Sequence, residues 1–175
     1  MDLTEKTLNS RGIYSGRIIK VRVDTVSLPN GRQSTREVVE HAGAVAVVAL
    51  DDDNNVILVR QYRKPVEKVL MEIPAGTMGV DEDPLECAQR ELREETGYTA
   101  EHWKKILSYF SAPGFTDEQL HLYLATGLRG GETDTDEDEF VETVHLPLEE
   151  AYRLIFAGQI IDGKSIIGIQ YAWKR

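Results

Sequence analysis

Residues Gly76 to Tyr98 read GTMGVDEDPLECAQRELREETGY, and this stretch carries the clearest structural signals in the chain. Asp83 is a residue type that caps helices, and Pro84 suits the first helical position. Gly97 suits the left-handed conformation that often follows the last helical residue. Together these signals predict a helix over residues 84–96.

Three carboxylates of this helix fall close together near its C-terminal end. At about 100° per residue, Glu91, Glu94 and Glu95 gather within an arc of about 100°. Like charges at this spacing repel each other, and anions near a helix C-terminus oppose the helix dipole. A hard divalent cation would offset the repulsion, because Mg²⁺ takes oxygen ligands and fills its remaining positions with water and phosphate. Alternatively, Arg90 and Arg93 pair with their neighbours and the helix is an ordinary charged surface helix.

The charge balance restricts the class of partner. The chain has 30 acidic and 20 basic side chains and a formal net charge of -10, which argues against binding nucleic acid or an anionic membrane. A phosphorylated small molecule is compatible with this net charge, because bound divalent cations reverse the local charge.

The longest apolar run, Ala44–Leu50, is too short to cross a bilayer, and the N-terminal residues lack the apolar region of a signal peptide. We therefore expect a cytoplasmic protein.

The rest of the pattern predicts more strands than helices, in a mixed order. Ala44–Leu50 is apolar on both faces, as expected of a central strand, and a polar turn then leads into Val56–Val59, which predicts a hairpin. Apolar and charged residues alternate over Ile19–Val23, which indicates a strand with one solvated face. Further strands are predicted at residues 69–73, 106–110, 120–124 and 140–146, and further helices at residues 148–156 and 165–173.

The stretch from Gly76 to Tyr98 resembles the Nudix box, whose pattern is G-x5-E-x7-R-E-U-x-E-E-x-G-U with U an aliphatic residue. Every fixed position of the pattern is matched, by Gly76, Glu82, Arg90, Glu91, Glu94, Glu95 and Gly97. Leu92 fits the first aliphatic position, whereas Tyr98 departs from the last. Fixed residues at fixed spacing over this length form a specific signal.

Outside the box, the chain resembles the ADP-ribose pyrophosphatase subfamily. Pro113 lies sixteen residues after Gly97, where that subfamily carries a marker proline. The same resemblance extends to residues 36–41, 60–63 and 72–76. Taken alone, the Pro-Gly pair at residues 113–114 would indicate an ordinary turn.

The resemblance implies an α+β fold, a Nudix α/β/α sandwich with a mixed sheet and an additional N-terminal antiparallel β arm. We expect residues 1–42 to form this arm, which would be a dimerisation element, and residues 43–175 to form the Nudix hydrolase domain. Members of the family exchange their arms between subunits. A homodimer is therefore expected, in which some substrate-binding residues serve the partner's active site.

The resemblance also implies a metal site. Glu91 and Glu95 correspond to the main metal ligands, and the backbone carbonyl of Ala75 corresponds to a further one. Glu139, in an acidic run before residue 140, is implied as an additional metal contact. The expected cofactor is Mg²⁺, with Mn²⁺ as an alternative and more than one ion bound.

Catalytic roles follow from the same comparison. Glu137 is implied as the general base, and Glu94 is the alternative base or a further metal ligand. Arg90, with Glu82, is implied to hold the helix and its loops in register. Taken alone, the acidic run that contains Glu137 would be read as a solvated loop.

Substrate contacts are implied at several positions outside the helix. Arg63 would lie near the diphosphate, where an arginine can form a fork of charge-assisted hydrogen bonds. The adenosine end would be contacted by Arg17, Ile18, Arg36 and Glu37, and the ribose side by Thr77 and Gly114. The alternative is that these positions are ordinary strand or loop surface.

The function implied is Mg²⁺-dependent hydrolysis of ADP-ribose to AMP and ribose 5-phosphate. One alternative is a pyrophosphatase for another nucleoside diphosphate sugar, such as a GDP-sugar. A second alternative is a Nudix module that senses a nucleotide without cleaving it, although the complete set of box carboxylates disfavours this.

Overall fold

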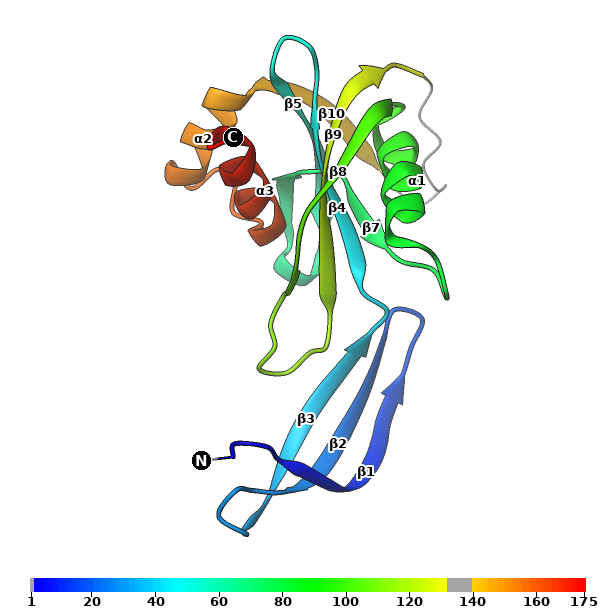
Figure 1. Ribbon diagram of the computed structural model, residues 1–175, viewed down its shortest axis with the longest axis vertical. Coiled ribbons are helices and arrows are strands. Elements are labelled where there is room, and N and C mark those ends of the chain that lie inside the picture. The colour runs from blue at the N-terminus through cyan, green and yellow to red at the C-terminus, as the bar shows by residue number, and fades with distance from the viewer. Residues whose placement is uncertain (1, 132–139) are drawn as a thin grey trace. The chain divides into compact units, whose positions relative to one another are not determined.

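The computed structural model describes residues 2–131 and 140–175 (Figure 1). The described chain divides into two compact units. The first comprises the residues up to Gly43 together with Tyr109–Gln119, and the second comprises Ala44–Ser108 together with Leu120–Arg175. Residues 109–119, which the predicted boundary assigned to the hydrolase domain, thus belong to the same unit as the N-terminal arm.

The first unit is built on an antiparallel sheet with the strand order β1-β2-β3. These strands are β1 (Lys6–Ser15), β2 (Ile19–Ser27) and β3 (Gln33–His41). The predicted N-terminal antiparallel arm is therefore confirmed. β2 and β3 are joined by a turn in which the Gly31 amide donates a hydrogen bond to the Leu28 carbonyl at 2.8 Å. Gly31 adopts φ 82°, a left-handed conformation that costs glycine little.

The loop at residues 111–118 belongs to the first unit because it is hydrogen-bonded to β3. The Val39 amide donates to the Phe115 carbonyl at 2.8 Å, and the Asp117 amide donates to the Val39 carbonyl at 3.3 Å. The Asp117 carboxylate also accepts from the His41 amide at 2.9 Å. The loop that contains the marker proline is thus fixed along the edge of β3.

The second unit carries a mixed sheet with the order β10-β5-β4-β9-β8. β4 runs parallel to β9 and antiparallel to β5, which confirms the predicted hairpin. β8 and β9 are longer than their apolar runs predicted, because β8 continues through charged, partly exposed residues and β9 through small and polar ones. The strands are β4 (Ala44–Leu50), β5 (Asn55–Arg63), β6 (Lys68–Glu72), β7 (Ala75–Thr77), β8 (Thr99–Phe110), β9 (Gln119–Arg129) and β10 (Val141–Pro147).

Helices cover both faces of this sheet. Figure 1 shows α1 (Pro84–Thr96) on one face, and α2 (Leu148–Phe156) with α3 (Gly163–Trp173) on the other. A 3-10 turn, η1 (Lys64–Val66), follows β5. One buried apolar cluster lies between the sheet and α2 and α3, and a second lies between the sheet and α1. The predicted α/β/α sandwich is therefore confirmed.

The ends of α1 match their sequence signals. The Asp83 side chain accepts hydrogen bonds from the amides of Leu85 and Glu86, at 2.8 and 3.3 Å. Gly97 adopts φ 73° and its amide donates to the Arg93 carbonyl at 2.8 Å. These caps satisfy backbone groups that lack partners inside the helix, so they fix where α1 begins and ends.

The sheet opens between β4 and β5, and the segment Glu72–Gly76 fills the opening. β5 continues beside β6, and β4 continues beside β7. The chain crosses between them at Pro74, whose carbonyl accepts from the Val47 amide at 2.9 Å. On the α3 side, the buried Ser165 hydroxyl accepts from the Ile73 amide at 2.8 Å.

None of the helices that the structure describes is long and apolar enough to cross a membrane.

Gly168 shows how closely α3 packs on the sheet. A Cβ at this position would lie 2.6 Å from Cγ2 of Val48 and 3.1 Å from Cδ1 of Ile73. Alanine normally stabilises a helix by up to about 1 kcal/mol relative to glycine, but overpacking a core costs about 1–3 kcal/mol. We expect Gly168→Ala to lower the free energy of unfolding, measured by urea denaturation.

Gly163→Ala is the matched control, because a Cβ at the first residue of α3 would meet no described atom within 4 Å. This variant should be as stable as the unsubstituted protein or slightly more stable. Equal stabilisation by both substitutions would contradict the close contact between α3 and β4.

Candidate active site

α1 places two carboxylates against the backbone of β7. A Cβ at Gly76 would fall 1.9 Å from Cδ of Glu91, so the Glu91 carboxylate occupies the space that any other residue would fill. One turn later, Glu95 is 3% exposed and its Oε2 accepts a hydrogen bond from the Ala75 amide at 3.0 Å. Glu91 and Glu95 therefore converge on the Ala75–Gly76 backbone.

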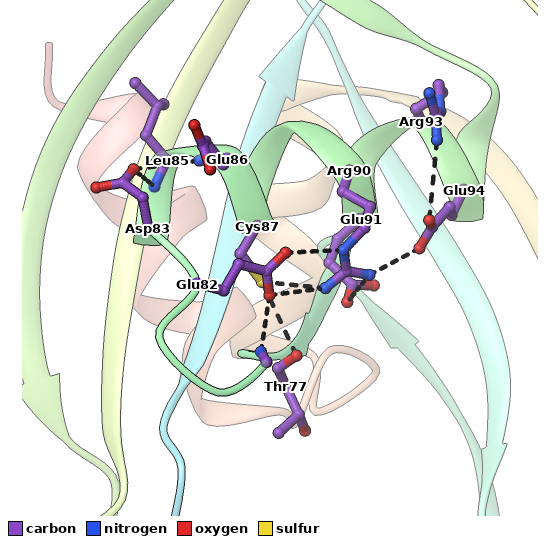
Figure 2. Close-up of polar contacts among 11 residues, drawn as sticks. Thr77, Glu82, Asp83, Leu85, Glu86, Cys87, Arg90, Glu91, Arg93 and Glu94 are labelled. Atoms are coloured by element: carbon purple, nitrogen blue, oxygen red, sulfur yellow. Dashed lines mark hydrogen bonds and ion pairs between the residues drawn. The ribbon is translucent and has the colours of Figure 1, made fainter.

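Arg90 links α1 to the loop that precedes it. Its guanidinium donates to both carboxylate oxygens of Glu82, at 2.9 and 3.2 Å (Figure 2). Nη1 of Arg90 also lies 2.8 Å from Glu91 and 2.8 Å from Glu94. Glu82 in turn accepts from the Gly79 amide at 2.7 Å. One cation thus offsets part of the carboxylate repulsion and holds the loop in place.

This ion pair shifts the pKa of both partners. The hydrogen bonds from Arg90 lower the pKa of Glu82 to about 2, despite the opposing effect of burial. The pKa of Arg90 is raised, chiefly by the hydrogen bond to Glu82 and also by the charge of Glu91. Both groups therefore carry their full charges at neutral pH.

Cys87 lies beneath this network and is fully buried. Its sulfur is 3.9 Å from the Thr77 carbonyl and 3.3 Å from Nη2 of Arg90. Burial, followed by the hydrogen bond to Glu82, raises the pKa of the thiol to about 12. The thiol is thus protonated at neutral pH, which is unlike a catalytic nucleophile.

A second charged cluster lies at the end of β5. Arg63 donates to both oxygens of Glu72, at 2.9 and 2.8 Å. Glu72 is 1% exposed and also binds Lys164 of α3. The pKa of Arg63 is raised, chiefly by the hydrogen bond to Glu72, with further contributions from the charges of Glu95 and Asp162. The charge of Glu95 on α1 therefore acts on Arg63.

Sequence reasoning did not single out Glu72 or Lys164 as parts of the site. Glu72 entered only as one letter of a run that resembles a subfamily, and Lys164 lies 92 residues further along the chain. A buried carboxylate needs cationic partners. An acidic residue at the end of an apolar strand was therefore the sequence signal that could have indicated this ion pair.

The donor atoms of the site suit a hard divalent cation. Among residues 2–131 and 140–175, no three or more His, Cys, Asp or Glu side chains group together in a way that could hold a metal ion. Glu91 and Glu95 provide carboxylate oxygens at the Ala75–Gly76 backbone. Mg²⁺ usually takes only one or two protein carboxylates and completes its octahedron with water and phosphate. The donor set at β7 therefore fits such an ion.

The remaining predicted site residues are divided between the units. Arg63 and Thr77 lie in the second unit, close along the chain to the residues just described. Glu137 and Glu139 lie outside the described residues. In the first unit lie Arg17, Ile18, Arg36, Glu37 and Gly114.

Family models match nearly the whole described chain. Residues 40–166 match the NUDIX domain, and residues 5–39 match the Nucleoside diphosphate sugar hydrolase N-terminal domain. The chain therefore belongs to the Nudix family, and the resemblance seen in residues 76–98 is confirmed. Nudix hydrolases generally use divalent metal ions.

Relatives agree with this assignment over most of their lengths. A "Methanol dehydrogenase activator" from Bacillus methanolicus is 49% identical over 95% of this chain and 91% of its own. An "ADP-ribose pyrophosphatase" from Bacillus subtilis (strain 168) is 46% identical over 97% of this chain and 92% of its own. The crystal structure of an ADP compounds hydrolase matches with a TM-score of 0.86, at 22% identity over 99% of this chain and 95% of that one. This last match shows that the fold is shared.

The lowered pKa of Glu82 makes a prediction about acid stability. A carboxylate with a lowered pKa stabilises the folded state above its ordinary pKa of about 4.5, and this stabilisation disappears as the pH falls toward 2. We expect Glu82→Gln to cost about 1–3 kcal/mol of unfolding free energy at pH 7 and much less near pH 3. Urea denaturation of both proteins across this pH range measures the difference.

Glu86→Gln is the control, because it neutralises an exposed carboxylate of the same helix and leaves the pair with Arg90 intact. Its effect should vary little with pH. A pH-independent effect of Glu82→Gln would contradict an ion pair that stabilises the fold.

Proposed function

We propose that this chain hydrolyses ADP-ribose to AMP and ribose 5-phosphate. The observation that carries the proposal is the pair Glu91 and Glu95 on the Ala75–Gly76 backbone, within a Nudix chain 46% identical to an ADP-ribose pyrophosphatase. The relative named as an activator has no substrate in its name, so it does not bear on the substrate.

Glu91, Glu95 and the Ala75 carbonyl would hold the metal, which we propose to be Mg²⁺, with Mn²⁺ as an alternative and more than one ion bound. When bound, these ions would neutralise the diphosphate and lower the pKa of an attacking water. Glu139, in the acidic run, is proposed as a further metal contact. Arg90, through Glu82, keeps α1 and its preceding loop fixed, so that the carboxylates do not reorganise when substrate binds.

Arg63 is proposed to bind the diphosphate. Its Nε and Nη2 are held by Glu72, whereas no described residue accepts a hydrogen bond from Nη1, and the side chain is 39% exposed. The general base that takes the proton of the attacking water is proposed to be Glu137, with Glu94 as the alternative. Thr77 is proposed to contact the ribose side.

The first unit is proposed to contribute the adenosine contacts Arg17, Ile18, Arg36 and Glu37, and Gly114 on the ribose side. We also propose that the chain is a cytoplasmic homodimer with exchanged arms. All of β1 is exposed, including Leu8, Ile13 and Tyr14, and exposed apolar side chains of this kind suit burial against a second copy.

ADP-ribose should be the preferred substrate in a panel of nucleoside diphosphate sugars assayed with Mg²⁺. We expect a kcat/KM at least about tenfold above that for a GDP-sugar, because substrate contacts in one pocket typically discriminate by this order. Chromatography of the products should show AMP and ribose 5-phosphate.

The panel also tests two alternatives. Cleavage of another nucleoside diphosphate sugar is favoured by the description of the N-terminal family model, and a GDP-sugar with an equal or higher kcat/KM would establish it. Tight nucleotide binding without turnover at any divalent-ion concentration would instead indicate a sensing module.

Glu95→Gln tests the proposed metal site. Glutamine keeps a side-chain oxygen that can accept from the Ala75 amide, so the fold should persist, while one anionic ligand is lost. We expect turnover to fall by roughly two orders of magnitude or more, and Mn²⁺ affinity, measured by calorimetry, to fall as well.

Glu149→Gln, which changes an exposed carboxylate on α2, should leave both turnover and Mn²⁺ affinity unchanged. Turnover at the original rate in a well-folded Glu95→Gln variant would remove Glu95 from the metal site.

A further inference from the structure

Four charged side chains meet where β5, β6 and the start of α3 come together. Glu72 is 1% exposed, and its carboxylate is shared between Arg63 and Lys164. The ammonium of Lys164 also lies 3.1 Å from Asp162, the residue that caps α3. Only 12% of the Lys164 side chain is exposed, so this cation is largely removed from solvent.

The cluster is neutral, with two cations and two anions. Burial raises the pKa of Glu72, but the hydrogen bond from Arg63 and the charge of Lys164 outweigh burial, so the pKa lies below its ordinary value. Glu72 is therefore ionised at neutral pH. When a buried carboxylate loses one of two cationic partners, its negative charge interacts more strongly with the cation that remains.

The geometry leaves one edge of Arg63 for a ligand. Glu72 binds Nε and Nη2, and this planar fork fixes the orientation of the guanidinium. No residue of the described chain accepts a hydrogen bond from Nη1. The charge of Glu95 contributes to the raised pKa of Arg63, so this carboxylate of α1 acts electrostatically on the guanidinium.

We propose that Lys164 is a positioning residue for the hydrolysis: by sharing the Glu72 carboxylate, it sets the orientation and the free positive charge of Arg63, the group that binds the substrate diphosphate. This inference rests on the proposed function. With Lys164 present, the charge of Glu72 is divided between two cations, and Arg63 keeps positive potential for the substrate. Without Lys164, Glu72 neutralises Arg63 alone.

Attachment of α3 to the sheet does not depend on Lys164. The Ser165 hydroxyl accepts from the Ile73 amide at 2.8 Å, and Asp162 accepts from the Ser165 amide at 3.0 Å. α3 also buries Ile169 and Ala172 in the core. A loss of Lys164 should therefore alter substrate binding more than it alters the packing of α3.

Steady-state kinetics of Lys164→Met with ADP-ribose tests the proposal. We expect KM to rise about tenfold while kcat changes less than about threefold, because Arg63 acts through substrate binding. Lys164→Arg keeps the cation and should restore KM to within about threefold. Lys174→Met, the same replacement at an exposed position at the end of α3, should leave KM and kcat unchanged. An unchanged KM in folded Lys164→Met would overturn the proposal.

A double-mutant cycle shows whether Lys164 acts through Arg63. Arg63→Ala should raise KM on its own, and adding Lys164→Met should raise it no further. If Lys164→Met raises KM by the same factor in both backgrounds, Lys164 acts elsewhere and the proposal fails.

A further variant keeps the test decisive if Lys164→Met does not fold. The double variant Glu72→Gln/Lys164→Met removes one charge of each sign and leaves the cluster neutral. It should fold, yet its KM should stay elevated, because Arg63 keeps its charge but no carboxylate fixes its orientation. A KM equal to that of the unsubstituted protein would overturn the proposal.

The activity of the unsubstituted protein distinguishes a failure of the proposed function from a failure of the inference about Lys164. If that protein does not cleave ADP-ribose, the proposed function fails, and the same variants are measured with the best substrate of the panel. If no substrate is cleaved, the dissociation constant of ADP-ribose from calorimetry replaces KM, with the same expected and contradicting results.

Discussion

The site depends on how the segment Glu72–Gly76 is held where the sheet opens. From one face, Glu95 of α1 accepts from the Ala75 amide, and from the other face Ser165 of α3 accepts from the Ile73 amide. Backbone groups in the interior require partners, and here the partners come from both helical layers. The strand that would present a carbonyl to a metal is therefore fixed relative to the helix that would present the carboxylates.

The electrostatics of the site follow from this packing. Glu91 lies on Gly76 because a glycine there leaves room for its carboxylate, and Arg90 then offsets part of the accumulated negative charge. The Arg90–Glu82 pair joins α1 to its preceding loop, whereas Glu91 and Glu95 lie at the backbone where the metal is proposed to bind. The fold and the proposed metal site thus draw on neighbouring members of one charged group, and local repulsion of this kind is expected at functional sites.

Sequence reasoning succeeded where the signal was local. Both ends of α1 were predicted because Asp83 and Gly97 act on neighbouring backbone groups. The buried strand β4 was predicted from its continuous apolar run. β1 was not predicted, because all of its residues are exposed and show no apolar alternation. The contact of Glu72 with Lys164 could not be predicted, because it joins residues distant in sequence through tertiary packing alone.

The burial of the chain's one cysteine has a consequence for how motion of α1 can be followed. Cys87 is fully covered by the helix and the sheet, and its thiol is protonated in the folded state. The thiolate is the form that attacks an alkylating reagent, and the reagent must reach the sulfur, so labelling would occur only when α1 separates locally from β7. The rate of such labelling therefore reports how often α1 opens, with the protein's own cysteine as the reporter.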